Sequence, residues 1–126
     1  MTILKDATPI AIICTRDVAA TAAFYRDTLG FTPVTQDAYA AVFRVGGIDL
    51  RVSLVPDFTP SGHTTLSFHV EDVSAVVVAL AAKGVVFHRA SHLTLDASGI
   101  WNIPGGRGRV AWLADPEGNL LSLTSL

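Results

Sequence analysis

The sequence carries little charge for its 126 residues: 16% are charged and the net charge at pH 7 is −2. Nine Lys and Arg against eleven Asp and Glu leave no basic excess to neutralise phosphates, which argues against a nucleic-acid partner. Half of the residues are hydrophobic, so a disordered chain is also excluded. We therefore expect one compact domain, or two small modules that share a core.

Cysteine and long apolar runs are equally scarce. The single cysteine, Cys14, cannot form an intramolecular disulfide and indicates a reducing compartment. The longest apolar run, residues 76–82, is far shorter than the roughly 20 residues that span a bilayer. Residues 1–6 lack the layout of a signal peptide. These features predict a cytoplasmic protein with no membrane partner.

The N-terminal half of the chain predicts one helix among several strands. Residues 10–14 are apolar and mostly β-branched, which is typical of a strand buried on both faces. Asp17 is a good N-cap for a helix over residues 18–29, which Gly30 ends. Further strands are predicted at residues 31–35, 39–45 and 48–54.

The same order recurs after residues 56–62, whose prolines indicate a linker. Asp72 precedes the second predicted helix as Asp17 precedes the first, and Gly118 matches Gly47 in a turn between strands. The predicted elements of this half are a strand at 65–70, a helix at 73–83, and strands at 85–87, 110–113 and 120–124. The chain therefore contains an internal repeat.

The second copy is about 16 residues longer than the first, and the extra residues lie within 88–108. A long irregular insertion in a compact domain is more often functional than not. Trp101 within it suits a lid that closes over a planar apolar ligand. A local anchor that fixes the loop is the alternative. A mobile surface loop with no such role is a third possibility.

Three motifs identify the scaffold: RDV at residues 16–18, FYRDTLGF at 24–31 and WLADPEGN at 112–119. In this order they resemble the vicinal oxygen chelate superfamily, which includes glyoxalase I, extradiol dioxygenases, and fosfomycin- and bleomycin-resistance proteins. The resemblance covers nearly the whole chain and is specific for the superfamily, but not for one function within it. The motif residues themselves are helix caps, helix-to-sheet packing and a hairpin turn.

The resemblance implies an α+β fold of two tandem βαβββ modules. Their curled mixed sheets would surround a shared cleft, with the helices outside. Module one would span about residues 7–56, the linker 56–62 and module two about 63–126. Members of the superfamily often form homodimers, so we expect one here, with or without exchange of modules.

Metal-dependent members place a ligand on the first and last strand of each module, facing the cleft. Counting from the motifs, the equivalent positions here hold Ile10, Arg51, Thr65 and Ser122. Isoleucine has no donor atom, arginine repels a divalent cation, and two neutral hydroxyls are poor ligands by themselves. A catalytic site needs about three good protein ligands. We therefore expect no metal and no other cofactor.

The histidines offer little replacement for these ligands. His63 and His69 would lie about 20 Å apart on one strand. His88, His92 and Asp96 have helical spacing, but their neighbours predict strand and loop. Ordinary surface histidines are the simpler interpretation.

The alternation of side chains along the strands predicts which residues face the cleft. The predicted ligand-binding residues are Asp49, Arg51, Ser53, Thr65, Ser67, His69 and Ser122, together with Trp101 from the insertion. Arg51 could bind a carboxylate or phosphate, or could instead pair with Asp49 on the same face. Trp112 suits either the core or the pocket.

These observations favour a glyoxalase/bleomycin-resistance-like protein that binds a small, partly apolar molecule, anionic or aromatic, in a metal-free cleft. The alternative is a lactoylglutathione-lyase-like or dioxygenase-like enzyme whose metal is relocated or absent. A third possibility is a protein-binding role with a vestigial cleft. The sequence identifies no catalytic residue and does not specify the ligand.

Overall fold

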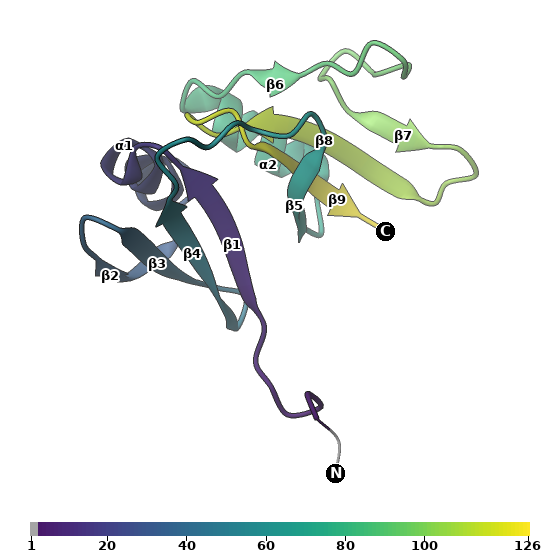
Figure 1. Cartoon of the computed structure of the whole chain (residues 1–126). Coiled ribbons are helices and arrows are strands. Elements are labelled where there is room, and N and C mark those ends of the chain that lie inside the picture. The colour runs from purple at the N-terminus through teal and green to yellow at the C-terminus, as the bar shows by residue number, and fades with distance from the viewer. Residues whose placement is uncertain (1–2) are drawn as a thin grey trace. The chain divides into compact units, whose positions relative to one another are not determined.

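The computed structural model describes residues 3–126. The chain divides into two compact units, Met1–Phe58 and Thr59–Leu126, and each contains one mixed sheet and one main helical segment (Figure 1). This confirms the predicted α+β class with tandem βαβββ modules. No helix within the described residues has the length and apolar character needed to cross a membrane.

The first unit is a four-stranded sheet with the order β1-β4-β3-β2. β1 lies parallel to β4, and the other neighbours are antiparallel. The elements are β1 (Ile10–Thr15), α1 (Val18–Ala23), η1 (Phe24–Thr28), β2 (Thr32–Gln36), β3 (Ala40–Val45) and β4 (Ile48–Leu54). The helical segment starts at the predicted cap, because the Asp17 carboxylate accepts a hydrogen bond from the Ala20 amide at 3.1 Å.

The helix of this unit covers one face of the sheet. Tyr25 is fully buried and contacts Phe43, with ring centroids 6.3 Å apart. Leu50 and Val52 are buried on the same side of β4, as the alternation predicted. The prediction that β1 is buried on both faces is wrong: Ile13 is buried but Ile12 is 50% exposed. The reason is that β1 is an edge strand and the helix covers only one face of its sheet.

The second unit is a five-stranded sheet with the order β5-β9-β8-β6, in which β7 also pairs with β8. Its elements are β5 (Thr64–His69), α2 (Val73–Ala82), β6 (Phe87–His88), β7 (Trp101–Ile103), β8 (Gly108–Ala114) and β9 (Leu120–Ser125). α2 packs against β8 and β9, and Val73 and Val77 are buried together with Leu113 and Leu121. Asp72 caps α2 as predicted, through the Ala75 amide at 3.0 Å.

The insertion within residues 88–108 is an ordered part of this unit. Asp96 accepts hydrogen bonds from the amides of Ser98 and Ile100 at 2.9 and 3.1 Å, and Ile100 is fully buried. The segment then continues into β7, which forms a hairpin with β8. These contacts join residues 96–103 to the rest of the unit and favour a packed segment over a mobile surface loop.

Candidate ligand-binding site

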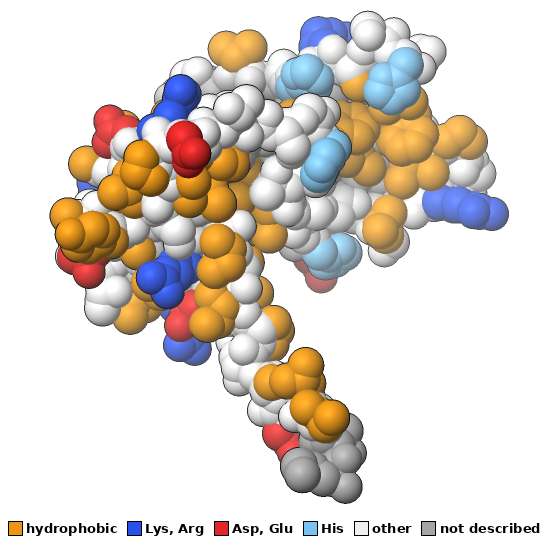
Figure 2. Space-filling view, viewed as in Figure 1, with side chains coloured by type: hydrophobic (Ala, Val, Ile, Leu, Met, Phe, Trp, Pro, Cys, Tyr) orange, Lys and Arg blue, Asp and Glu red, His pale blue; other side chains and the backbone are white. Residues whose placement is uncertain are grey.

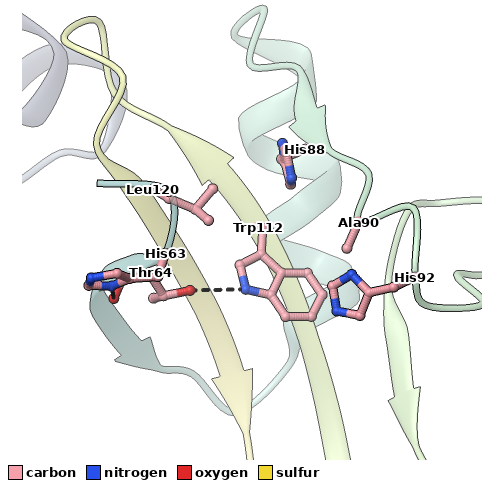
Figure 3. A pocket seen from close by; sticks show the side chains of 8 residues that line it. His63, Thr64, His88, Ala90, His92, Trp112 and Leu120 are labelled. Carbon is pink, nitrogen blue, oxygen red and sulfur yellow. Dashed lines mark hydrogen bonds between the residues drawn. The ribbon is translucent and has the colours of Figure 1, made fainter. Parts of the chain in front are cut away.

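A pocket of about 310 Å³ lies on the sheet of the second unit (Figure 3). Its lining comprises Gly62, His63, Thr64, His88, Ala90, His92, Trp112 and Leu120. Thr64, Trp112, Ala90 and Leu120 are partly buried and form the floor, whereas the three histidines are exposed and form the rim. Figure 2 shows apolar side chains gathered on this unit with histidines beside them.

Trp112 lies on the face of the sheet opposite α2. Its neighbours in β8, Ala111 and Leu113, are buried on the helix side, so Trp112 points the other way. In the strand register Trp112 is opposite His88 of β6 and Ser122 of β9. The sheet therefore brings an imidazole and a hydroxyl residue to the two sides of the indole.

Thr64 holds the indole in place from β5, which lies two strands away from β8 in the same sheet. The Trp112 Nε1–H group donates a hydrogen bond to Thr64 Oγ1 at 3.2 Å. The pairing of β5 with β9 is irregular here, since Thr64 is opposite Leu120 and Leu66 is opposite Leu121. Thr65 is the extra residue of this bulge, and the bulge brings Thr64 to the face that carries Trp112.

Trp101 lies beside Trp112, with ring centroids 6.3 Å apart and ring planes 28° from parallel. It belongs to β7, where it is opposite Val110 of β8. Because it stands in a paired strand and stacks on a second tryptophan, Trp101 fits the local anchor better than the lid. It extends the aromatic surface at the edge of the pocket.

The remaining predicted residues of this unit also lie on β5 and β9. Ser122 is 5% exposed and its hydroxyl donates to Ser67 Oγ at 2.7 Å. Ser67, Thr65 and His69 are exposed, and none of them lines the pocket. Of the predicted set, the structure brings Ser67 to Ser122, and Trp101 to the lining residue Trp112.

The first unit holds the other predicted residues, Asp49, Arg51 and Ser53, on β4. The suggested pairing of Asp49 with Arg51 is wrong: Asp49 forms its ion pair with Arg44 of β3, at 2.8 Å. The strand register explains this, because Arg44 is directly opposite Asp49, whereas Arg51 lies two residues further along the same strand.

Arg51 is exposed and its charge acts on a different carboxylate. The pKa of Asp37 is lowered, chiefly by hydrogen bonds from the amides of Tyr39 and Ala40, and additionally by the positive charge of Arg51. Asp37 is thus held ionised at the turn before β3.

The residues at the superfamily's metal positions do not fit a metal ion. Ile10 offers no donor atom and Arg51 is a cation. The Ser122 hydroxyl is engaged by Ser67, and Thr65 is the extra residue of the bulge. Among residues 3–126 the histidines, cysteine and carboxylates form no cluster of three suited to a metal. Asp96, which shares helical spacing in the sequence with His88 and His92, instead accepts hydrogen bonds from the Ser98 and Ile100 amides and forms an ion pair with Arg109.

The sequence did not point to Thr64 as a pocket residue, and His63, His88 and His92 were interpreted as ordinary surface histidines rather than as metal ligands or pocket residues. The alternation of side chains predicted that Thr65, not Thr64, faces the cleft, because a bulge leaves no clear signal in a single sequence. The position of the histidines around Trp112 depends on strand pairing between distant segments, above all β6 with β8.

The fold is that of an α+β protein of two tandem βαβββ modules, and a pocket lies on the sheet of the second module. The model described as the Glyoxalase/Bleomycin resistance protein/Dioxygenase superfamily matches residues 8–123. The chain belongs to this superfamily, as its motifs suggested.

Solved structures support the fold. Lactoylglutathione lyase from Agrobacterium tumefaciens has a TM-score of 0.73 and 18% identity, with 95% of this chain and 93% of that chain covered. The fosfomycin resistance protein FosX from Listeria monocytogenes has a TM-score of 0.76 and 14% identity, with 96% and 93% covered. A glyoxalase family protein from Enterococcus faecalis has a TM-score of 0.72 and 19% identity, with 98% and 100% covered. Among curated proteins, none matches this chain in sequence.

Proposed function

We propose that this protein binds a small, partly apolar molecule with a planar ring, which lies against Trp112 in the pocket of the second unit. The observation that carries the proposal is the state of the indole. It is partly buried in the pocket floor, and its only polar group is already bonded to Thr64. What the indole offers a ligand is therefore an apolar, polarisable surface rather than a hydrogen bond.

The dimensions of the pocket limit the ligand. A volume of about 310 Å³ is at the lower end of the range for small-molecule sites. Such a space suits a molecule of one or two rings. Stacking on an aromatic side chain contributes about 0.5–1.5 kcal/mol beyond the burial of area, so the ring is a substantial part of the binding energy.

The proposed site works without a metal, because the residues at the superfamily's metal positions do not supply ligands. The alternative is an enzyme similar to the lactoylglutathione lyase whose fold this chain shares. Turnover of an aldehyde–thiol adduct that is abolished by a chelator would favour that alternative. Two expectations accompany the proposal: a cytoplasmic location, from the lone Cys14, and a homodimer, from the family resemblance.

A comparison of two neutral probes tests the function. Naphthalene-2-carboxamide should shift the indole N–H resonance of Trp112 in a ¹H–¹⁵N NMR titration, whereas cyclohexanecarboxamide should shift it far less. The resonance is assigned with the variant Trp112→Phe. Trp112→Leu, which lacks this resonance, should weaken binding of the aromatic probe about tenfold or more as measured by isothermal titration calorimetry.

The matched control replaces an aromatic side chain outside the pocket. Tyr39 is 72% exposed in the first unit, so Tyr39→Leu should leave the affinity of the naphthalene probe unchanged. Equal shifts with both probes, or binding that survives Trp112→Leu, would contradict the proposal.

A further inference from the structure

We infer that the pocket selects an aromatic acid: the ring packs on Trp112 and an acid oxygen accepts a hydrogen bond from the Thr64 hydroxyl. This inference rests on the proposed function and specifies the ligand class of the same site. It follows from the hydrogen-bonding capacity of one side chain and from the charges around it.

The Thr64 hydroxyl is oriented by its contact with Trp112. An indole N–H can only donate, so Thr64 Oγ1 is the acceptor in its 3.2 Å contact with Trp112. A hydroxyl that accepts in this way keeps its own proton to donate. Within the part of the chain that the structure describes, no side chain or carbonyl takes that proton. Figure 3 shows Thr64 at the pocket with its oxygen toward the indole nitrogen.

The hydroxyl proton of Thr64 lies in a partly buried environment. Thr64 is partly buried beside the apolar floor formed by Trp112 and Leu120. A donor in such a setting gains more from a ligand acceptor than it would at an open surface, since water competes less. An acceptor atom attached to a ring on Trp112 would therefore be the favoured partner of the hydroxyl.

The residues that line the pocket also bear on the charge of the ligand. The lining contains three imidazoles, from His63, His88 and His92, and no carboxylate. A neutral imidazole can donate one hydrogen bond as well as accept one, and no lining residue carries a negative charge that would repel an anion. His88 stands directly opposite Trp112 in the pairing of β6 with β8, which places one imidazole next to the ring site.

The donor proton of Thr64 and a lining without carboxylates favour a carboxylate over a neutral acceptor. A hydrogen bond to a charged acceptor is roughly twice as strong as one between neutral groups. The ligand class is therefore a one- or two-ring aromatic carrying a carboxylate or a similar acidic group.

The test compares three probes that share the naphthalene ring: naphthalene-2-carboxylate, naphthalene-2-carboxamide and protonated 2-naphthylmethylamine. Their dissociation constants are measured on the full chain from the Trp112 indole resonance. The carboxylate should bind about tenfold more tightly than the amine, with the amide between them. Thr64→Val, which keeps the shape but loses the hydroxyl, should weaken the carboxylate about tenfold and the amine less than twofold.

Thr64→Ser is the matched control, since it keeps the hydroxyl and should retain the preference for the carboxylate. Equal affinities of the three probes for the unmodified protein would overturn the aromatic-acid inference and leave the ring site standing. So would an unchanged preference in Thr64→Val. If none of the probes shifts the Trp112 resonance, both the inference and the proposed function fail. The comparison of probes on the unmodified protein decides the matter even if Thr64→Val does not fold.

Discussion

The indole nitrogen of Trp112 lies 3.2 Å from the hydroxyl oxygen of Thr64, although β8 and β5 are not neighbours in the sheet. β9 lies between them, and the hydrogen bond therefore spans it on the open face. The indole passes over the β9 residues, which accounts for the burial of Ser122, its partner in the β8–β9 pairing. One side chain thus closes the floor of the pocket and links three strands.

Replacing this nitrogen should cost stability. Trp112→Phe removes the N–H group and leaves the Thr64 oxygen without its donor, so the free energy of unfolding should fall by about 1–2 kcal/mol. Urea denaturation followed by circular dichroism measures the change. Trp101→Phe is the control. It makes the same replacement at the neighbouring tryptophan, leaves the bond between Trp112 and Thr64 in place and partly retains the stacking on Trp112. An equal loss in both variants would show that the hydrogen bond contributes nothing.

The fold could be predicted in outline because its signals are local. Asp17 and Asp72 each stand before a run of helix-forming residues, and both are N-caps in the structure. The pocket could not be predicted to the same degree, since Thr64 reaches it through a bulge and His88 through pairing with Trp112. Register and bulges are set by contacts between segments distant in the sequence.

The turn before β9 depends on one carboxylate. Asp115 is 5% exposed and accepts hydrogen bonds from the amides of Glu117 and Asn119 and from the Asn119 side chain, each at 2.9 Å. Asp115→Ala removes the shared acceptor of these three hydrogen bonds, so unfolding should become easier by about 2–3 kcal/mol. Thermal unfolding measures the effect. Asp57→Ala, at an exposed position, should change stability by less than about 0.5 kcal/mol; a similar loss in both variants would count against the assigned role.

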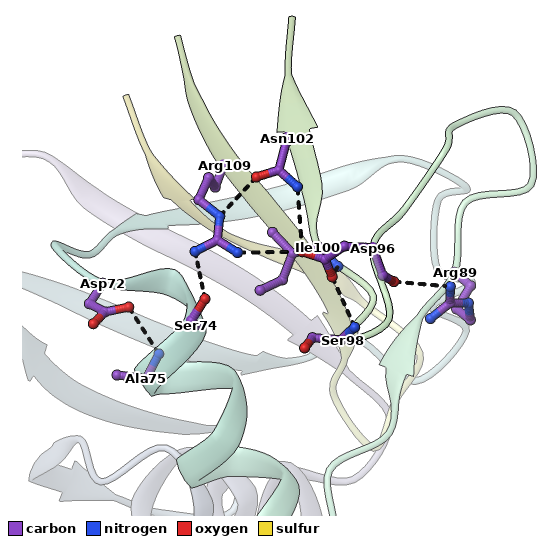
Figure 4. Close-up of polar contacts among 9 residues, drawn as sticks. All are labelled: Asp72, Ser74, Ala75, Arg89, Asp96, Ser98, Ile100, Asn102 and Arg109. Carbon is purple, nitrogen blue, oxygen red and sulfur yellow. Dashed lines mark hydrogen bonds and ion pairs between the residues drawn. The ribbon is translucent and has the colours of Figure 1, made fainter. Parts of the chain in front are cut away.

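Asp96 should make the stability of the second unit fall in acid. Its pKa is lowered, chiefly by the hydrogen bond from the Ile100 amide, and also by Ser98, Asn102 and the charge of Arg109, against the opposing effect of burial. Arg109 in turn donates to Asn102 and to Ser74 of α2, so the carboxylate is part of a network that joins the insertion to the sheet and helix (Figure 4).

The direction follows from the linkage between protonation and folding. A carboxyl whose folded pKa is below its unfolded value stabilises the protein fully above the unfolded value, about 3.9. That stabilisation is lost as the pH falls through the folded pKa. Asp96→Asn should therefore reduce the loss of stability below about pH 4, measured by urea midpoints at several pH values. Asp37 has the same direction of shift and remains in the variant, so the acid loss should shrink without vanishing. An unchanged acid dependence would show that Asp96 does not contribute.

Gly108 at the start of β8 should tolerate no side chain. Its φ is +142°, and a Cβ atom there would overlap the backbone carbonyl of Ser125 at the end of β9. Neither strand can yield without breaking the β8–β9 pairing that holds Trp112 in place, so Gly108→Ala should lower the free energy of unfolding by more than about 3 kcal/mol. Gly106→Ala provides the comparison in the same hairpin, since its φ is +68° and no atom lies within 4 Å of the added Cβ. That variant should lose only the cost of the left-handed backbone, about 1–2 kcal/mol. Thermal and urea unfolding of the two variants measure the difference. If Gly108→Ala proves no more destabilising than Gly106→Ala, the close approach of β8 and β9 at this point is not as tight as the structure has it.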